Sequence, residues 1–337
     1  MPAQEKGPQP GRADDGPWVT VIGESLVDII HDPRRGTATP EAHPGGSPLN
    51  VAVGCSRLDL RTKLVTHFAE DPYGQMIADH LHSNGVDAIA GGSFPTSTAV
   101  ASLDTTGAAD YTFAISWDLK GASVPALAAV EGSLHVHTGS IASVLPPGNK
   151  SVRRLIEAAR PHATVSFDPN CRPAISRDAA GARDQTEDFV AASDIVKASD
   201  EDLRWLYPGR TPDESMAAWL KLGPALVALT RGADGPVIIT RRGRVELPGE
   251  AVPVADTVGA GDSFMAALIS GLAQLDALGA PARERLQDIT PGELQALAAY
   301  ANRAAAITCS RPGANPPTSA ELGSLTGSSA FRTGRPW

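Results

Sequence analysis

Short apolar runs that alternate with helical patterns constrain the fold of this chain more than any other feature. Most of the runs are rich in β-branched residues and bounded by turn residues, as in strands buried on both faces of a parallel sheet. The alternation predicts an α/β fold with a mainly parallel sheet. The predicted strands are Trp18–Ile22, Ser133–Thr138, Thr164–Asp168, Asp194–Ala198, Ala225–Thr230 and Val237–Thr240. The predicted helices include Ser151–Arg160, Pro212–Leu222 and Ser263–Leu275.

Two segments, at about 31–45 and 95–118, interrupt this alternation because neither has a helical period. In the second, Ser97 to Phe113 alternates around the turn at Thr106-Gly107, as exposed antiparallel strands do. We interpret the two segments as a small antiparallel β-sheet that projects from the main domain as a lid. An ordinary surface hairpin explains the same pattern equally well.

The two ends of the chain differ in composition from the rest. Residues 1–17 are rich in Pro, Gly and charge, which predicts a disordered tail, and residues 326–337 predict a loose C-terminal tail. Residues 18–325 form the predicted α/β domain, with the lid segments inside it.

Charge, cysteine content and missing motifs argue against several classes of function. The formal net charge is -9 without a long run of Lys or Arg, so we expect no nucleic acid partner. Three widely spaced cysteines suit a reducing cytoplasm. No stretch resembles a signal peptide or a membrane span, so we predict a cytoplasmic protein without a membrane partner. A dinucleotide oxidoreductase would need G-x-G-x-x-G after the first strand, where this chain has Gly23-Glu24-Ser25-Leu26-Val27-Asp28. A P-loop kinase would need a Walker A string, which this sequence lacks.

The strongest functional signal is the string Asp256-Thr257-Val258-Gly259-Ala260-Gly261-Asp262-Ser263-Phe264. Its small residues let the backbone approach a ligand, and they lead into a helix whose free N–H groups favour an anion. Asp262 would then lie beside a transferring phosphate, where a carboxylate can accept the proton of an attacking hydroxyl. A glycine-rich loop with an acidic helix cap is the alternative.

A second glycine cluster occurs early, at Pro44-Gly45-Gly46-Ser47-Pro48-Leu49-Asn50. Ser47 is a plausible N-cap and Pro48 a first-turn residue, so a helix is expected to start here. Gly45 and Gly46 would let a polyol touch the main chain, and Asn50 offers a donor and an acceptor to hydroxyls. A tight turn before a helix explains the glycines and the proline equally well.

Together the two clusters resemble the ribokinase family, also called the phosphofructokinase-B family of carbohydrate kinases. The resemblance extends from about Val19 to Pro317 and implies a ribokinase-like, three-layer fold and an ATP-dependent sugar kinase. Four further motifs contribute to it: Gly23-Glu24-Ser25-Leu26-Val27-Asp28, Glu70-Asp71-Pro72-Tyr73-Gly74, Asp168-Pro169-Asn170-Cys171-Arg172 and Leu229-Thr230-Arg231-Gly232.

The resemblance implies a role for each residue that matches a motif. Asp262 is similar to the catalytic base, and Gly259, Ala260 and Gly261 to the anion hole. The implied sugar-binding residues are Asp28, Gly45, Gly46, Asn50 and Arg172. The implied nucleotide-binding residues are Ser199, Thr230, Gly232, Gly235 and Asn302.

Two metal sites are also implied. Many relatives carry Asn-x-x-Glu where this chain has Ser199 and Asp202, so Asp202 is expected to reach Mg²⁺ through its water shell. A helix N-cap followed by acidic residues explains the same pair. Pro317 replaces a small polar residue that is often found in the family's loop for a monovalent cation such as K⁺. That loop is matched here by Asp256, Val258, Arg311 and Gly313.

His135 and His137 form a His-x-His pattern on a predicted strand, so both side chains would face the same way. That spacing can bind a metal ion. No third ligand lies nearby in the sequence, so we interpret them as core or hinge histidines.

Fructose is the expected sugar. Asp168-Pro169-Asn170-x-Arg172 is most similar to fructokinases, and the lid stretch 111–117 has no Arg to pair the carboxylate of 2-keto-3-deoxygluconate. A 2-keto-3-deoxygluconate kinase is an alternative, because Arg172 could meet a substrate carboxylate. A ribose or nucleoside kinase is another, because Phe94, Phe113 and Trp117 could form a stacking wall. A non-catalytic sugar sensor is another. An exposed strand edge of the lid favours a homodimer.

Overall fold

A nine-stranded sheet forms the centre of the molecule, in the computed structural model that describes residues 16–31, 40–103, 109–176 and 178–325. Seven neighbouring strands, β11, β10, β9, β8, β1, β4 and β5, are parallel to one another. At one end of the sheet, β12 pairs antiparallel with β11, and β13 pairs antiparallel with β12. Their order is β13-β12-β11-β10-β9-β8-β1-β4-β5. Their bounds are β1 Trp18–Ile22, β4 Thr62–His67, β5 Val86–Gly91, β8 Ser133–Gly139, β9 Thr164–Asp168, β10 Ile195–Ser199, β11 Leu226–Thr230, β12 Val237–Thr240 and β13 Gly243–Glu246.

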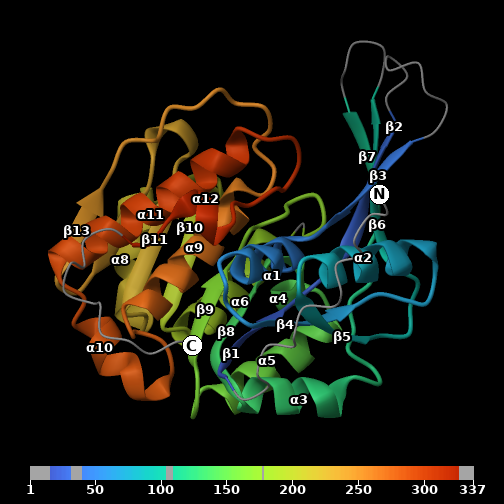
Figure 1. Ribbon diagram of the computed structural model, residues 1–337, viewed down its shortest axis with the longest axis horizontal. Coiled ribbons are helices and arrows are strands. Elements are labelled where there is room, and N and C mark those ends of the chain that lie inside the picture. Colours follow the sequence, from blue (N-terminus) through green and yellow to red (C-terminus); the bar gives the residue numbers. More distant parts are fainter. Residues whose placement is uncertain (1–15, 32–39, 104–108, 177, 326–337) are drawn as a thin grey trace, which may run out of the picture.

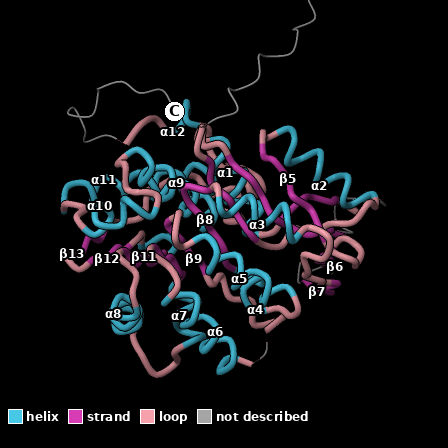
Figure 2. Tube along the Cα trace, turned by 90° about the horizontal axis from the view of Figure 1, so that it is seen from below, coloured by secondary structure: helices cyan, strands magenta, loops and turns pink. Residues whose placement is uncertain are grey.

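Helices cover both faces of this sheet, so the predicted three-layer α/β fold is confirmed (Figure 2). One face packs under α1 (Ser47–Arg57), α2 (Pro72–Ser83), α9 (Ala260–Gln274), α10 (Arg283–Gln287), α11 (Pro291–Cys309) and α12 (Ser319–Leu322). The other packs under α3 (Ser123–Glu131), α4 (Ser140–Val144), α5 (Gly148–Ala159), α6 (Ala179–Ala191), α7 (Asp200–Leu206) and α8 (Pro212–Leu222). None of the described helices is long and apolar enough to cross a membrane.

A smaller four-stranded sheet projects from this body at the upper right of Figure 1. Its order is β3-β2-β6-β7, with β2 Leu26–His31, β3 Glu41–Gly45, β6 Ser97–Leu103 and β7 Ala109–Ala114. Both outer pairs are antiparallel, and the central pair of β2 and β6 is parallel. The parallel pair arises because β2 and β6 each start from the main body and run outward together. The predicted turn at Thr106-Gly107 lies outside the described residues.

The carboxyl ends of the parallel strands bring the candidate site together. Asp168 ends β9, Ser199 ends β10 and Thr230 ends β11, so the loops after three neighbouring strands share one edge of the sheet. Ligands of open α/β sheets bind at this edge. The predicted tails fall on residues 1–15 and 326–337, outside the described residues, apart from Gly16 and Pro17.

Candidate active site

Asp262 lies where the two glycine clusters meet. It is the third residue of α9, and its side chain is buried. The Ser47 hydroxyl donates to Asp262 Oδ1 at 2.6 Å, and Asn50 Nδ2 donates to Asp262 Oδ2 at 2.8 Å. Two motifs more than 200 residues apart in the sequence therefore hold one carboxylate in a fixed orientation.

These contacts correct one expectation and qualify another. Ser47 is not the N-cap of α1. Gly46 takes that position with φ of 109°, and Ser47 begins the helix, so its hydroxyl is free to reach across to α9. Asn50 was expected to bind sugar hydroxyls. In the structure its amide nitrogen serves the carboxylate, because an ionised acceptor attracts a buried donor more strongly than a neutral one does.

The predicted anion hole forms the start of α9. Gly259 is the N-cap with φ of 75°, in the left-handed region that favours glycine, and Ala260 and Gly261 belong to the first turn. A methyl group at Gly259 would lie 2.6 Å from Ala314 Cβ. The first turn of a helix presents N–H groups that have no partner within the helix. They can bind an anion beside Asp262.

Asp28 lies against the glycine pair that precedes α1. Asp28 is on β2, and a methyl group at Gly45 on β3 would lie 2.3 Å from its Oδ2. A methyl group at Gly46 would lie 2.6 Å from the Glu24 carbonyl oxygen. The chain itself therefore needs both glycines, whether or not a polyol contacts them. Burial raises the pKa of Asp28, and the charges of His43 and Arg172 oppose this rise.

A cavity of about 750 Å³ adjoins the predicted anion hole and runs along the carboxyl ends of β10 and β11. Arg172 lines it, and its Nη1 donates to Asn170 Oδ1 at 2.7 Å. Asn302 on α11 also lines it and donates to the Pro248 carbonyl at 3.0 Å. All five residues predicted to bind a nucleotide line this cavity: Ser199, Thr230, Gly232, Gly235 and Asn302. Ala260 and Gly261 of the predicted anion hole line it as well.

Asp202, inside the first turn of α7, forms a capping box with the N-cap Ser199 and lines the same cavity. Its Oδ2 accepts from the Ser199 N–H and hydroxyl at 2.8 and 2.6 Å, and its Oδ1 accepts from the Cys171 N–H at 2.7 Å. The helix-cap interpretation therefore describes its contacts. Across the described ranges, no group of three or more His, Cys, Asp or Glu could hold a metal ion. A magnesium ion would need oxygen ligands from phosphate or water here.

Asp256 links the two loops that are predicted to hold a monovalent cation. Its Oδ1 accepts from the Val258 N–H at 3.0 Å, and its Oδ2 accepts from the Gly313 N–H at 2.9 Å. Arg311, two residues before Gly313, directs its guanidinium away to Glu321, at 2.6 Å. The structure thus brings the four predicted residues close together, and the carboxylate supplies the link between the loops.

Sequence reasoning missed Lys197 and Glu24. Lys197 on β10 is buried, lines the cavity and places Nζ 2.7 Å from Asp168 Oδ2. A lysine within an otherwise apolar run was the available signal, since lysine is rarely buried without a partner. Glu24 is 2% exposed and accepts from the Ala142 N–H at 3.0 Å.

His135 and His137 lie inside the sheet, on β8. His135 bonds Thr164 and Ser166 at 2.9 and 2.7 Å, and His137 bonds Ser166 at 2.9 Å. Burial lowers the pKa of each histidine to about 3. The described contacts are those of neutral core histidines.

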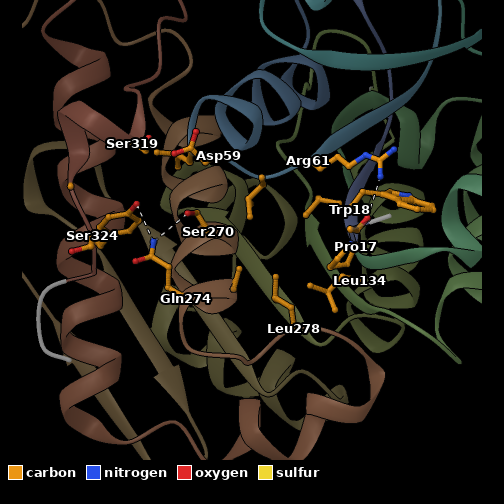
Figure 3. A pocket seen from close by; sticks show the side chains of 17 residues that line it. Pro17, Trp18, Asp59, Arg61, Leu134, Ser270, Gln274, Leu278, Ser319 and Ser324 are labelled. Atoms are coloured by element: carbon orange, nitrogen blue, oxygen red, sulfur yellow. Dashed lines mark hydrogen bonds between the residues drawn. The ribbon is translucent and has the colours of Figure 1, made fainter. Parts of the chain in front are cut away.

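A second cavity, of about 920 Å³, lies at the opposite edge of the sheet, at the amino end of β1 (Figure 3). Gln274 and Ser270 face it, and the Gln274 amide bonds Ser270 and Tyr300. Gln274 Oε1 also accepts from the Leu325 N–H. None of the predicted site residues lines this cavity, so we place the active site at the carboxyl edge.

Known proteins share this architecture. The family model for pfkB family carbohydrate kinases matches residues 18–321. A fructokinase from Rhizobium leguminosarum bv. trifolii is 31% identical over 263 residues, 75% of this chain and 79% of the relative. Fructokinase from Xylella fastidiosa with bound ATP has a TM-score of 0.79 at 23% identity, covering 91% of this chain and 97% of that chain. A fructokinase double mutant from Vibrio cholerae O395, in a form with fructose, ADP and potassium ion bound, has a TM-score of 0.71 at 25% identity, covering 93% and 96%.

The fold is that of a small-molecule kinase. The chain belongs to the pfkB family of carbohydrate kinases. It is a phosphotransferase that transfers a phosphoryl group from ATP to an alcohol group of a sugar.

Proposed function

We propose that the sugar is fructose and that Asp262 is the base that activates its primary hydroxyl. The observation that carries the mechanism is the pair of hydrogen bonds from Ser47 and Asn50, which hold the Asp262 carboxylate in a fixed orientation where the two glycine clusters meet. The relatives named fructokinase support the choice of sugar. A Vibrio cholerae O395 relative with fructose and ADP bound supports it as well.

In this mechanism Asp262 accepts the hydroxyl proton as the sugar oxygen attacks the γ-phosphorus of ATP. The new P–O bond forms as the bond to the β,γ-bridging oxygen breaks, and that oxygen keeps the electron pair in ADP. Negative charge that develops on the transferred group is stabilised by the N–H groups of residues 259–261. Asp28, with Gly46 and Asn50, would hold the sugar on the other side.

The lid supports a neutral sugar. Its described part from Thr112 to Trp117 contributes no arginine that could pair a carboxylate. Trp117 is 1% exposed and donates to the Ala142 carbonyl, so it belongs to the core and cannot form a stacking wall for a nucleoside. Phe94 and Phe113 are exposed. A 2-keto-3-deoxygluconate kinase would need Arg172 to serve the acid group.

The metal requirements follow from the donor sets. Magnesium would enter with ATP and meet Asp202 through water, because both oxygen atoms of Asp202 already accept hydrogen bonds. Asp256 would face a potassium ion between the loops that it joins. Comparing turnover in potassium, sodium and choline chloride tests the second site.

We also propose that the protein works in the cytoplasm on small molecules and not on nucleic acid. We propose that it forms a homodimer through the small sheet, because β3 and β7 are the outer strands of that sheet and such edges pair readily. Light scattering after size-exclusion chromatography distinguishes a monomer from a dimer.

The substrate test is ADP release with ATP and magnesium across fructose, ribose, 2-keto-3-deoxygluconate, glucose and adenosine. Turnover that is highest with fructose supports the proposal. Turnover with a different member of the set keeps the kinase and replaces the sugar. Ligand-induced thermal stabilisation without any turnover would instead support the sugar sensor.

A further inference from the structure

Lys197 places a buried ammonium group beside the anion hole. Its side chain reaches from β10, and Nζ lies 2.7 Å from Asp168 Oδ2. A methyl group at Gly261 would lie 2.9 Å from Nζ, so the ammonium occupies the space over this glycine. The absence of a side chain at Gly261 therefore leaves room for the Lys197 ammonium at the place where an anion would bind.

The surroundings of Lys197 keep it charged. Burial alone would lower the pKa of Lys197, but the charges of Asp168, Asp202 and Asp262 outweigh burial and raise it. His137 also faces the group and stays neutral, because burial lowers its pKa to about 3. One cation is thus set among three carboxylates, in a wall that must receive the phosphates of a nucleotide. Because it stays protonated, lines the cavity and lies over Gly261, the ammonium can donate hydrogen bonds to an anion that binds there.

We propose that Lys197 is a catalytic residue that donates hydrogen bonds to the transferring phosphoryl group, and that Asp168 is the positioning residue that holds it there. This assignment rests on the proposed kinase mechanism. Lys197 keeps its proton throughout, since the hydroxyl proton goes to Asp262 and the leaving electron pair goes to ADP. Its contribution is to stabilise charge on the oxygens of the phosphoryl group in a site shielded from water.

The competing explanation is that Lys197 only neutralises the buried charge of Asp168. The two explanations differ in what happens when both charges are removed. Breaking a buried ion pair by removing one partner is costly, whereas removing both partners can be nearly neutral. The variants are therefore Lys197→Met, which has similar length and no charge, and the double variant Lys197→Met/Asp168→Asn. Lys221→Met, at an exposed lysine of α8, is the matched control.

We expect Lys197→Met to lower kcat with ATP and the preferred sugar by about 100-fold or more, with KM for the sugar within about threefold, as for loss of one transition-state donor. The double variant should regain thermal stability but not turnover. Lys221→Met should match the wild type in both. A double variant that recovers turnover to within about tenfold of the wild type would overturn the proposal.

A binding measurement tests Lys197 separately from the choice of sugar. Titration calorimetry would compare ADP with a non-hydrolysable ATP analogue that carries an imido bridge, each with magnesium. We expect Lys197→Met to weaken binding of the analogue by about tenfold or more and to leave ADP binding within about twofold. Equal effects on both ligands would refute the contact. If the wild type phosphorylates no sugar, the proposed function fails, while this comparison still decides the role of Lys197.

Discussion

Replacing Glu24 with glutamine should make the protein more stable at alkaline pH. Glu24 is 2% exposed, and its carboxylate accepts from the Ala142 N–H at 3.0 Å. Burial raises the pKa of Glu24 from 4.5 to about 7, against the opposing hydrogen bonds from Ser140 and Ala142. Glutamine keeps the shape and an acceptor oxygen, and it carries no charge to bury.

The sign and the size of the effect follow from linkage. The folded state holds the Glu24 proton more tightly than the unfolded state does, so the contribution of this group is fully present below pH 4.5 and is lost as the pH rises through 7. One pKa unit corresponds to about 1.4 kcal/mol, so the ionised carboxylate costs the folded state about 3 kcal/mol at pH 8. The glutamine variant avoids that cost.

Urea unfolding of the wild type and of Glu24→Gln, at pH 5 and pH 8, measures the effect. The free energy of unfolding of the variant, relative to the wild type, should increase by about 2–3 kcal/mol between the two pH values. Any baseline cost of the substitution cancels in this comparison. Glu131→Gln, at an exposed glutamate of α3, is the control and should show no such change. A relative stability of Glu24→Gln that is the same at both pH values would refute the reasoning.

Three further changes test the site and the core beside it. Asn50→Ala removes one donor to Asp262 and should lower kcat by about 10-fold or more while the fold is kept, which steady-state kinetics and thermal melts would show. His137→Gln should reduce the acid lability of the protein. The histidine pKa of about 3 means that the wild type loses stability as the pH falls below 6.5, by about 2 kcal/mol at pH 5, and unfolding curves at pH 5 and 7.5 report the difference. Gly259→Ala puts a side chain at φ of 75° and 2.6 Å from Ala314, so the melting temperature and turnover should both fall, with a cost of about 1–3 kcal/mol.

Local chemistry explains which elements could be predicted. The helix Pro212–Leu222 is found within the predicted bounds because Thr211 and Glu214 form a capping box around a first-turn proline. The observed bounds of β1, β8, β9, β10 and β11 agree with the predicted strands to within one residue at each end. These strands could be predicted because both of their faces are buried, so their sequences are largely apolar runs. β4 and β5 were missed because Lys63 and Asp87 interrupt their apolar pattern.

The parts of the site that could not be predicted depend on neighbours in space. Lys197 acquires its partner because β9 and β10 are adjacent in the sheet, and no spacing in the sequence encodes that pairing. Ser47 was assigned to a helix cap because capping is the usual role of a serine before a proline. Its contact with Asp262 requires α1 and α9 to pack side by side, which only the folded chain reveals.

The most direct test of the account is turnover of Asp262→Asn and Asp262→Ala with ATP, magnesium and fructose. We predict a loss of about 1,000-fold or more in kcat for both variants, with unchanged folding by circular dichroism and retained binding of ADP, because only the acceptor of the hydroxyl proton is removed. Turnover within about tenfold of the wild type in either variant would contradict the assignment of Asp262 as the base.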